Sequence, residues 1–222
     1  MLQSSTLKFL KDLKKNNNKP WFDSHRDAYE SAKEDFEQFV ARLISTHAKK
    51  DSSIESLKPK DCMFRINRDI RFSKDKSPYK TNFGASINQG GKKSIFAGYY
   101  FHCEPGESFV GGGIWMPMAP ELKKIRQEID YSLDEFKKII TTKKFRGVYD
   151  ELYDGEDAAL TKVPQGFDKE SPAAEYLKLK SILAMRKMPD KVMLSKDLLK
   201  ESQAAFEALM PLVHFINRAL GD

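Results

Sequence analysis

The sequence predicts an α+β fold in which a mainly antiparallel sheet, over about residues 61–117, is covered by N-terminal and C-terminal helices. Two observations predict this fold. Between residues 81 and 116, apolar side chains recur at every second position and turn signals separate the runs, which is typical of short antiparallel strands. Residues 1–50 and 120–222 instead repeat apolar residues at spacings of three and four, as amphipathic helices do. We expect one domain over residues 1–222, because this length suffices for a single sizeable core.

The composition indicates an ordinary soluble globular protein, with 40% hydrophobic and 11% aromatic residues. No apolar run approaches the roughly 20 residues that span a bilayer. The first residues have their lysines too late and their apolar positions too interrupted for a signal peptide. We therefore expect a cytoplasmic protein with no membrane partner. Cys62 and Cys103 could face each other on neighbouring strands, but reduced thiols are the expectation in such a protein.

The first fifty residues are predicted to form two helices. Ser4 or Ser5 can cap the first helix, and the three asparagines at residues 16–18 end it. Asp23 or Ser24 can cap a second, longer helix, whose buried face is Ala28, Ala32, Phe36, Phe39, Val40, Leu43 and Ile44. Trp21 lies just before this helix, where an aromatic ring either packs against the helix or serves as a stacking platform for a base or ring.

Residues 64–72 are predicted to form the first strand. Its apolar face consists of Phe64, Ile66, Ile70 and Phe72, and its polar face of Arg65, Asn67, Asp69 and Arg71. Arg68 falls on the apolar side, so it must pair with a carboxylate, reach past the sheet edge or lie at a bulge. Pro78 ends regular structure in the long connection that follows, and a second strand is expected at residues 81–87.

A β-hairpin is predicted next, with strands at residues 94–103 and 108–116 and a turn at residues 104–107. Both faces of the first of these strands are apolar or aromatic, which favours a central strand covered on both sides. Three consecutive glycines, including Gly112, lie within the second strand. They allow either close approach of a ligand such as a phosphate, or a bulge or crowded strand crossing.

The C-terminal half is predicted to be mainly helical. Pro120 begins one helix, and Ser132 with Glu135 forms a capping box for another. Residues 143–167 are expected to be irregular, and residues 171–183 helical. The final helix, residues 195–220, contains Pro211, which is expected to kink or divide it.

Positive charge is concentrated at the centre of the chain. Residues 58–93 contain ten Lys or Arg and three Asp, a net charge of +7, whereas the whole chain carries +6. A local positive field of this kind attracts phosphates, carboxylates or nucleic acid.

The most distinctive motif of this basic region is RxxRDxRFxxxKxPYKTxFGA, formed by Arg65, Arg68, Asp69, Arg71, Phe72, Lys76, Pro78, Tyr79, Lys80, Thr81, Phe83, Gly84 and Ala85. It resembles the signature of a widespread, largely bacterial family, domain of unknown function 2461. The resemblance extends over nearly the whole chain, including FLKDLKKNNNKPWF at residues 9–22, the glycines at residues 111–113 and GFDKESPAAEYLKLK at residues 166–180. The resemblance implies no particular activity.

Our first functional hypothesis is a site for a small anion that bears a phosphate or carboxylate. Its arginines would clamp the anion with charge-assisted bonds, and Asp69 would orient an arginine or act as a general base while Tyr79 or Lys76 donates a proton. The ligand-binding residues of this hypothesis are Arg65, Arg68, Arg71, Lys80, Asn82, Trp21 and Gly112.

Two other hypotheses use the same residues. The basic stretch could follow nucleic-acid phosphates while Trp21, Tyr79 or Phe83 stacks on bases. Alternatively, Arg–Asp pairs such as Arg65–Asp69 or Arg68–Asp69 serve only to fix the loop. The near-neutral remainder of the chain favours a compact anion site over a long surface that follows DNA.

Neither a metal site nor a cofactor is predicted. The four histidines, at positions 25, 47, 102 and 214, are far apart and lack the spacings of metal ligands. Ser73 with Lys76 and Ser77 with Lys80 match an SxxK nucleophile motif, but chance alone gives such matches in a lysine-rich loop.

Overall fold

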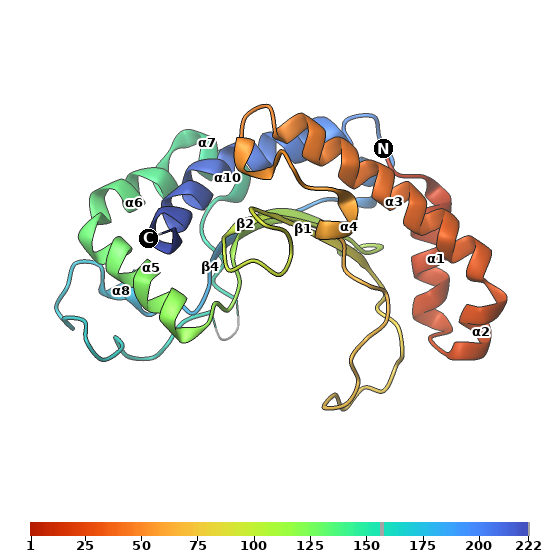
Figure 1. Ribbon diagram of the computed structural model, residues 1–222, viewed down its shortest axis with the longest axis horizontal. Coiled ribbons are helices and arrows are strands. Elements are labelled where there is room, and N and C mark those ends of the chain that lie inside the picture. The colour runs from red at the N-terminus through yellow and green to blue at the C-terminus, as the bar shows by residue number, and fades with distance from the viewer. Residues whose placement is uncertain (156–157, 222) are drawn as a thin grey trace.

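A four-stranded sheet forms the centre of the computed structural model, which describes residues 1–155 and 158–221 (Figure 1). All neighbouring strands are antiparallel, in the order β1-β2-β3-β4. The strands are β1 (Phe83–Asn88), β2 (Gly98–Cys103), β3 (Phe109–Ile114) and β4 (Ile182–Lys187). The α+β fold class predicted from the sequence is confirmed.

Helices from both ends of the chain surround this sheet. The N-terminal helices are α1 (Ser4–Lys15), α2 (Lys19–Ser24), α3 (Arg26–His47) and α4 (Pro59–Cys62), with a 3-10 turn, η1, at Ser52–Ile54. The C-terminal helices are α5 (Ala119–Tyr131), α6 (Leu133–Thr141), α7 (Lys143–Tyr149), α8 (Ala174–Leu177), α9 (Asp190–Met193) and α10 (Leu198–Leu220). In Figure 1, α3 and α10 lie over one face of the sheet, while α1 and α2 lie at one end of the molecule and α5, α6 and α8 at the other.

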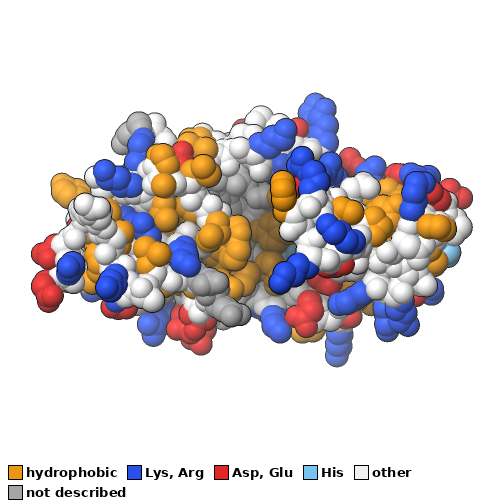
Figure 2. Space-filling view, turned by 90° about the horizontal axis from the view of Figure 1, so that it is seen from below, with side chains coloured by type: hydrophobic (Ala, Val, Ile, Leu, Met, Phe, Trp, Pro, Cys, Tyr) orange, Lys and Arg blue, Asp and Glu red, His pale blue; other side chains and the backbone are white. Residues whose placement is uncertain are grey.

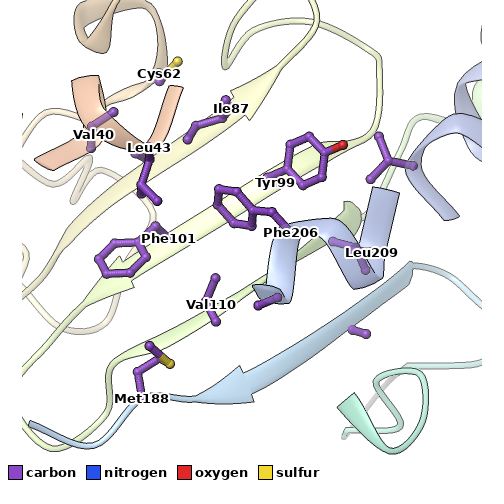
Figure 3. Close-up of a cluster of buried hydrophobic side chains, with 14 of the residues drawn as sticks. Val40, Leu43, Cys62, Ile87, Tyr99, Phe101, Val110, Met188, Phe206 and Leu209 are labelled. Carbon is purple, nitrogen blue, oxygen red and sulfur yellow. The ribbon is translucent and has the colours of Figure 1, made fainter. Parts of the chain in front are cut away.

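Alternation along the strands directs one set of side chains toward α3 and α10, and we call this side the covered face. Phe101 of β2 packs on Phe36 and Phe39 of α3, and its neighbour on the same face, Tyr99, packs on Phe206 of α10. Figure 3 shows these strand side chains grouped with Leu43 and Leu209. Such burial of large apolar side chains, each contributing about 1.5–3 kcal/mol, fixes the helices to the sheet.

Gly112 allows α10 to approach β3. A Cβ atom at this position would lie 2.7 Å from Cδ2 of Leu209 and 2.2 Å from the carbonyl oxygen of Gly98. The residue also has a φ of 154°, which side chains disfavour. The close approach of α10 and of the β2 backbone therefore accounts for this glycine.

The predicted sheet range of about residues 61–117 begins too early. Residues 64–82 form no strand and project from the sheet on the side opposite α3 and α10 (Figure 1); we call this segment the 64–82 excursion. It folds back on itself, since Arg68 N–H donates to the Pro78 carbonyl and Lys80 N–H to that of Ile66. Away from the core, Phe72 is 96% exposed.

The fourth strand lies where a helix was predicted. Only Ala174–Leu177 is helical within residues 171–183, and β4 begins at Ile182. Its residues Ile182 and Ala184 are fully buried on the covered face, in register with Ile114 and Gly112. Burial on the covered face, where α7 contacts β4, and pairing with β3 therefore override the helical appearance of this segment.

Other sequence predictions also need correction. Of the two effects expected of Pro211, division of the final helix is wrong, because Pro211 lies inside the single helix α10. Residues 143–149, expected to be irregular, form α7, and part of that irregular region, residues 156 and 157, lies outside the described residues. Finally, β2 is central, but helices cover only one of its faces, and the second face lines a cleft.

Candidate ligand-binding cleft

The second face of the sheet, which we call the open face, forms the floor of a cleft of about 920 Å³. Strand register places four glycines on this face: Gly84, Gly98, Gly111 and Gly113. Because glycines add no side chains, the floor is hollow around the few larger residues between them. These are Ser86, Asn88, Tyr100, His102, Phe109, Leu183 and Met185.

The two walls of the cleft differ in chemistry. The wall on the β1 side contributes Phe64, Lys80, Asn82, Lys92 and Lys93, and the wall that follows β3 contributes Trp115, Met116, Met118, Glu121 and Tyr153. Figure 2 shows a central hollow with hydrophobic side chains along one wall and Lys and Arg side chains along the other. This arrangement suits a molecule with one anionic end and one apolar end.

Lys80 supplies a partly buried positive charge at the basic wall. Burial lowers the pKa of its ammonium group, and the nearby charge of Arg65 lowers it further. Its Nζ lies 5.3 Å from the centre of the Phe64 ring. No carboxylate of residues 1–155 or 158–221 forms an ion pair with Lys80, so its charge is available to an anion in the cleft.

Tyr100, His102 and Glu104 form a hydrogen-bonded chain on the floor. The Tyr100 hydroxyl lies 3.3 Å from His102 Nδ1, and His102 Nε2 lies 3.2 Å from Glu104 Oε2. The Phe109 ring stacks on the imidazole at 4.6 Å, fixing its plane. The strand β2 and the turn that follows it thus hold a phenol, an imidazole and a carboxylate in line.

The ionisation of these three groups follows from their surroundings. Burial raises the pKa of Tyr100 to about 12 and lowers the pKa of His102. Burial also opposes ionisation of Glu104, but hydrogen bonds from His102, Thr81 and Lys14 outweigh it and hold the Glu104 pKa below its usual value. Near neutral pH the chain therefore contains a protonated phenol, a neutral imidazole and a carboxylate.

Gly84 gives the Tyr100 hydroxyl its position. A Cβ atom on Gly84 would lie 2.5 Å from the hydroxyl oxygen, a distance that only a glycine avoids. The hydroxyl can therefore lie directly against the backbone of β1. The glycine of the sequence signature thus has a physical explanation in the cleft.

Glu121, in the first turn of α5, contributes an unsatisfied acceptor to the apolar wall. Its Oε2 atom is buried and has no hydrogen-bond partner among the described residues. An unpaired buried acceptor of this kind is costly, so a ligand that donates a hydrogen bond here would be stabilised. Trp115, which also lines the cleft and is 65% exposed, packs edge-on against Tyr153.

Four of the residues predicted from the sequence lie in the 64–82 excursion and bond to one another or to its backbone. Arg71 donates two hydrogen bonds to Asp69, at 2.9 and 2.6 Å, and these hold the Asp69 pKa below its usual value. Arg68 pairs with Asp75 and also bonds to Ser73 and to the Ser77 carbonyl. Lys76 donates to the Ile70 carbonyl. Arg68 is thus paired with a carboxylate, one of the three outcomes expected of it.

The other predicted residues lie in different surroundings, and only some of them reach the cleft. Tyr79 is buried and stacks on Phe22 at 4.0 Å, and Trp21 stacks on His25 at the same distance. Lys80, Asn82 and Gly112 line the cleft, and the exposed Arg65 influences it through the pKa of Lys80. The structure thus brings three of the predicted residues together in the cleft.

Sequence reasoning missed the central residues of this site. Tyr100, His102 and Glu104 follow one another at every second position, so a search for polar side chains on one strand face would have found them. Within the described residues, no three His, Cys, Asp or Glu side chains are grouped as a metal site requires. None of the helices in the same residues is long and apolar enough to cross a membrane.

Comparison with known proteins gives one match. The model of a family described as "Conserved hypothetical protein (DUF2461)" matches residues 5–215. Neither the curated proteins nor the solved structures contain a match to this chain.

Proposed function

Since this chain belongs to the DUF2461 family, described only as conserved and hypothetical, we propose from the cleft alone that it binds a small organic anion with an apolar or aromatic body. The observation that carries this proposal is the glycine-floored open face, which leaves a hollow of about 920 Å³ between a basic and an apolar wall. That volume falls within the range of about 300–1,000 Å³ typical of small-molecule sites.

Lys80 is the residue we assign to the anionic group. Its ammonium is partly desolvated, and Asn82, two residues further along the chain, lines the same cleft. A charge-assisted hydrogen bond at such a position contributes roughly 1.5–3 kcal/mol, or about ten- to a hundredfold in affinity. A phosphate or a carboxylate could accept this hydrogen bond from Lys80 equally well.

The opposite wall selects the remainder of the ligand. Trp115, Met116 and Met185 offer apolar and aromatic surface, which favours a hydrocarbon chain or ring. Oε2 of Glu121 adds a preference for a hydroxyl or amine at that end. The proposed ligand is therefore amphiphilic, with a hydrogen-bond donor away from its anionic group.

A binding screen with a matched pair of variants tests this proposal. The panel holds aliphatic and aromatic carboxylates and phosphates, and thermal shift followed by calorimetry measures affinity. We expect a compound that stabilises the wild type to bind Lys80→Met roughly ten- to a hundredfold more weakly. Lys74→Met removes an exposed lysine that does not line the cleft, and it should retain wild-type affinity. Equal affinity in both variants would contradict the proposal.

The 64–82 excursion favours nucleic-acid binding as a second candidate function. Its Phe72 side chain is 96% exposed beside Arg71, whose guanidinium lies 5.8 Å from the ring centre. Exposed aromatic rings next to arginines are the groups that stack on unpaired bases. Affinity for a single-stranded oligonucleotide should then fall linearly on a log–log salt plot and weaken in Phe72→Ala, whereas a flat plot would remove this candidate.

A further inference from the structure

We propose that Tyr100, His102 and Glu104 form a relay that removes a proton from an acidic O–H or C–H group of the anion bound in the cleft. This inference rests on the proposed function, because the anion must first be held on the open face. It adds a reaction class, proton abstraction, and names the groups that carry it. Tyr100 is the catalytic residue that contacts the ligand, while His102 and Glu104 act through it.

The direction of each hydrogen bond follows from which groups can donate. A carboxylate can only accept, so His102 Nε2 carries the hydrogen that it shares with Glu104 at 3.2 Å. In a neutral imidazole the second nitrogen is then an acceptor. The Tyr100 hydroxyl, 3.3 Å from Nδ1, must therefore donate to His102. This is the arrangement in which a histidine can take a proton through a hydroxyl.

The proton transfer balances within these three residues. The ligand's X–H bond breaks and its proton forms a new O–H bond on Tyr100. The original hydroxyl proton of Tyr100 moves to Nδ1 of His102. The electron pair of the X–H bond stays on the ligand as an anion, and His102 becomes an imidazolium beside the Glu104 carboxylate. The same steps in reverse return the proton from His102, through Tyr100, to the ligand.

The charges around the relay favour the imidazolium that forms. Glu104 faces the ring directly, and its other oxygen, Oε1, accepts hydrogen bonds from Thr81 at 3.0 Å and from Lys14 of α1 at 3.4 Å. The Lys14 side chain is 58% exposed, so solvent screens its charge, whereas that of Glu104 is only 18% exposed. On the other faces the ring meets Phe109 and Tyr100, which are uncharged. The carboxylate is therefore the dominant charge at His102.

Lys80 favours the second charge that the transfer creates. The ligand gains a negative charge in a cleft that already holds this unpaired ammonium group at its basic wall. Opposite charges formed and held in a partly desolvated site stabilise each other more than they would in water. The relay and the anion site therefore act together.

The probe for the relay is 4-hydroxy-3-nitrobenzoate, which combines a carboxylate, an aromatic ring and a phenol whose absorbance reports its ionisation. Equilibrium dialysis against the full chain measures binding, and absorbance against pH measures ionisation of the bound probe. At the same pH, we expect the ratio of ionised to neutral phenol to be at least tenfold higher for the bound probe than for the free probe, which corresponds to a pKa lower by about one unit. Tyr100→Phe and Glu104→Gln should lose this gain while still binding the probe, and Lys74→Met should keep it. A bound probe that ionises equally in the wild type and in Glu104→Gln would overturn the relay.

A measurement on the ligand-free protein separates failure of the relay from failure of anion binding. Nitrogen-15 NMR of labelled histidine reports the tautomer of His102 directly. The relay requires hydrogen on Nε2 near neutral pH, and it requires Glu104→Gln to lower the pKa of His102 by about one unit, since an opposite charge is lost. Hydrogen on Nδ1, or an unchanged pKa, overturns the relay even if the probe binds. If the probe fails to bind, only the proposed function is contradicted for that probe, and the histidine spectrum decides the relay.

Discussion

Replacing Gly84 by alanine would put a methyl group where the Tyr100 hydroxyl lies. The new Cβ would be 2.5 Å from Oη and 3.2 Å from Cζ of that tyrosine. The ring would have to move by roughly 1 Å to restore van der Waals contact. Because the hydroxyl is already 3.3 Å from His102 Nδ1, such a shift would also break this hydrogen bond.

The expected cost follows from two opposing effects. Overpacking of a buried site costs roughly 1–3 kcal/mol, while removing a glycine from the unfolded chain contributes about 0.4–1 kcal/mol of stability. We therefore expect Gly84→Ala to lower the free energy of unfolding by about 1–2 kcal/mol. In a Tyr100→Phe background the loss should be much smaller, because the closest atom is gone and Cζ at 3.2 Å remains. The two substitutions should show a coupling energy of about 1 kcal/mol.

Urea unfolding of the four proteins of this cycle measures these quantities, with the slope on denaturant checked for constancy. Gly147→Ala is the matched control, because a Cβ atom at this position in α7 meets nothing within 4 Å and alanine favours helix. It should be neutral or stabilising. If Gly84→Ala is as stable as the wild type, or loses as much stability with phenylalanine at position 100, the close contact of glycine and hydroxyl is not what fixes Tyr100.

Three further outcomes are expected. Gly112→Ala should lower the free energy of unfolding by about 1–3 kcal/mol in urea titrations, because its Cβ would meet Leu209 of α10 and the backbone of β2. A neutral effect would contradict the close helix–sheet contact. Arg68→Met should speed amide hydrogen exchange in the 64–82 excursion, with the thermal midpoint little changed, because the arginine closes that segment through Asp75 and the Ser77 carbonyl; unchanged exchange would show that these bonds do not order it. His47→Gln should flatten the pH dependence of unfolding below about pH 6.5, because burial lowers the His47 pKa and the unfolded state binds the proton first. Wild-type stability should thus fall with decreasing pH there, by up to roughly 1 kcal/mol per pH unit from this residue, and an equal slope in the variant would refute this origin.

The covered face of the sheet could be predicted from the sequence because its physics is local. Phe83, Ala85 and Ile87 alternate with small or polar residues, and the hairpin at β2 and β3 has a short turn between two apolar strands. Such alternation records directly which side is buried. The same rule fails for β4, since Ile182, Leu183 and Ala184 form a continuous apolar run that periodicity cannot assign to helix or strand.

The 64–82 excursion shows the opposite error. Its alternating arginines and apolar residues imitate a strand, but only tertiary context decides whether a partner strand exists. The structure gives Arg68 and Arg71 acidic partners within the excursion itself, so the charged row needs no sheet behind it. Because the excursion does not join the sheet, Phe72 has no core to pack against and remains exposed to solvent.

The candidate site was predictable only in part. The basic stretch singled out in the sequence contains Lys80 and the polar Asn82, which do line the cleft. The spacing of Tyr100 and His102 could have placed them on one strand face, but it could not predict the cleft in front of them, because glycines on the neighbouring strands leave the open face unfilled. Which glycines share a face follows from strand register, and this is known only once the sheet has formed.

Methionine-methyl NMR tests most directly whether the open face is the binding site. Of the eight methionines, Met116, Met118 and Met185 line the cleft, while Met193 is fully buried outside it and Met210 lies on α10. Titration with 4-hydroxy-3-nitrobenzoate should shift the three cleft signals together and leave those of Met193 and Met210 unchanged. A ligand that binds and shifts Met210 or Met193 instead, with the cleft methionines unmoved, would place the site elsewhere and contradict the account.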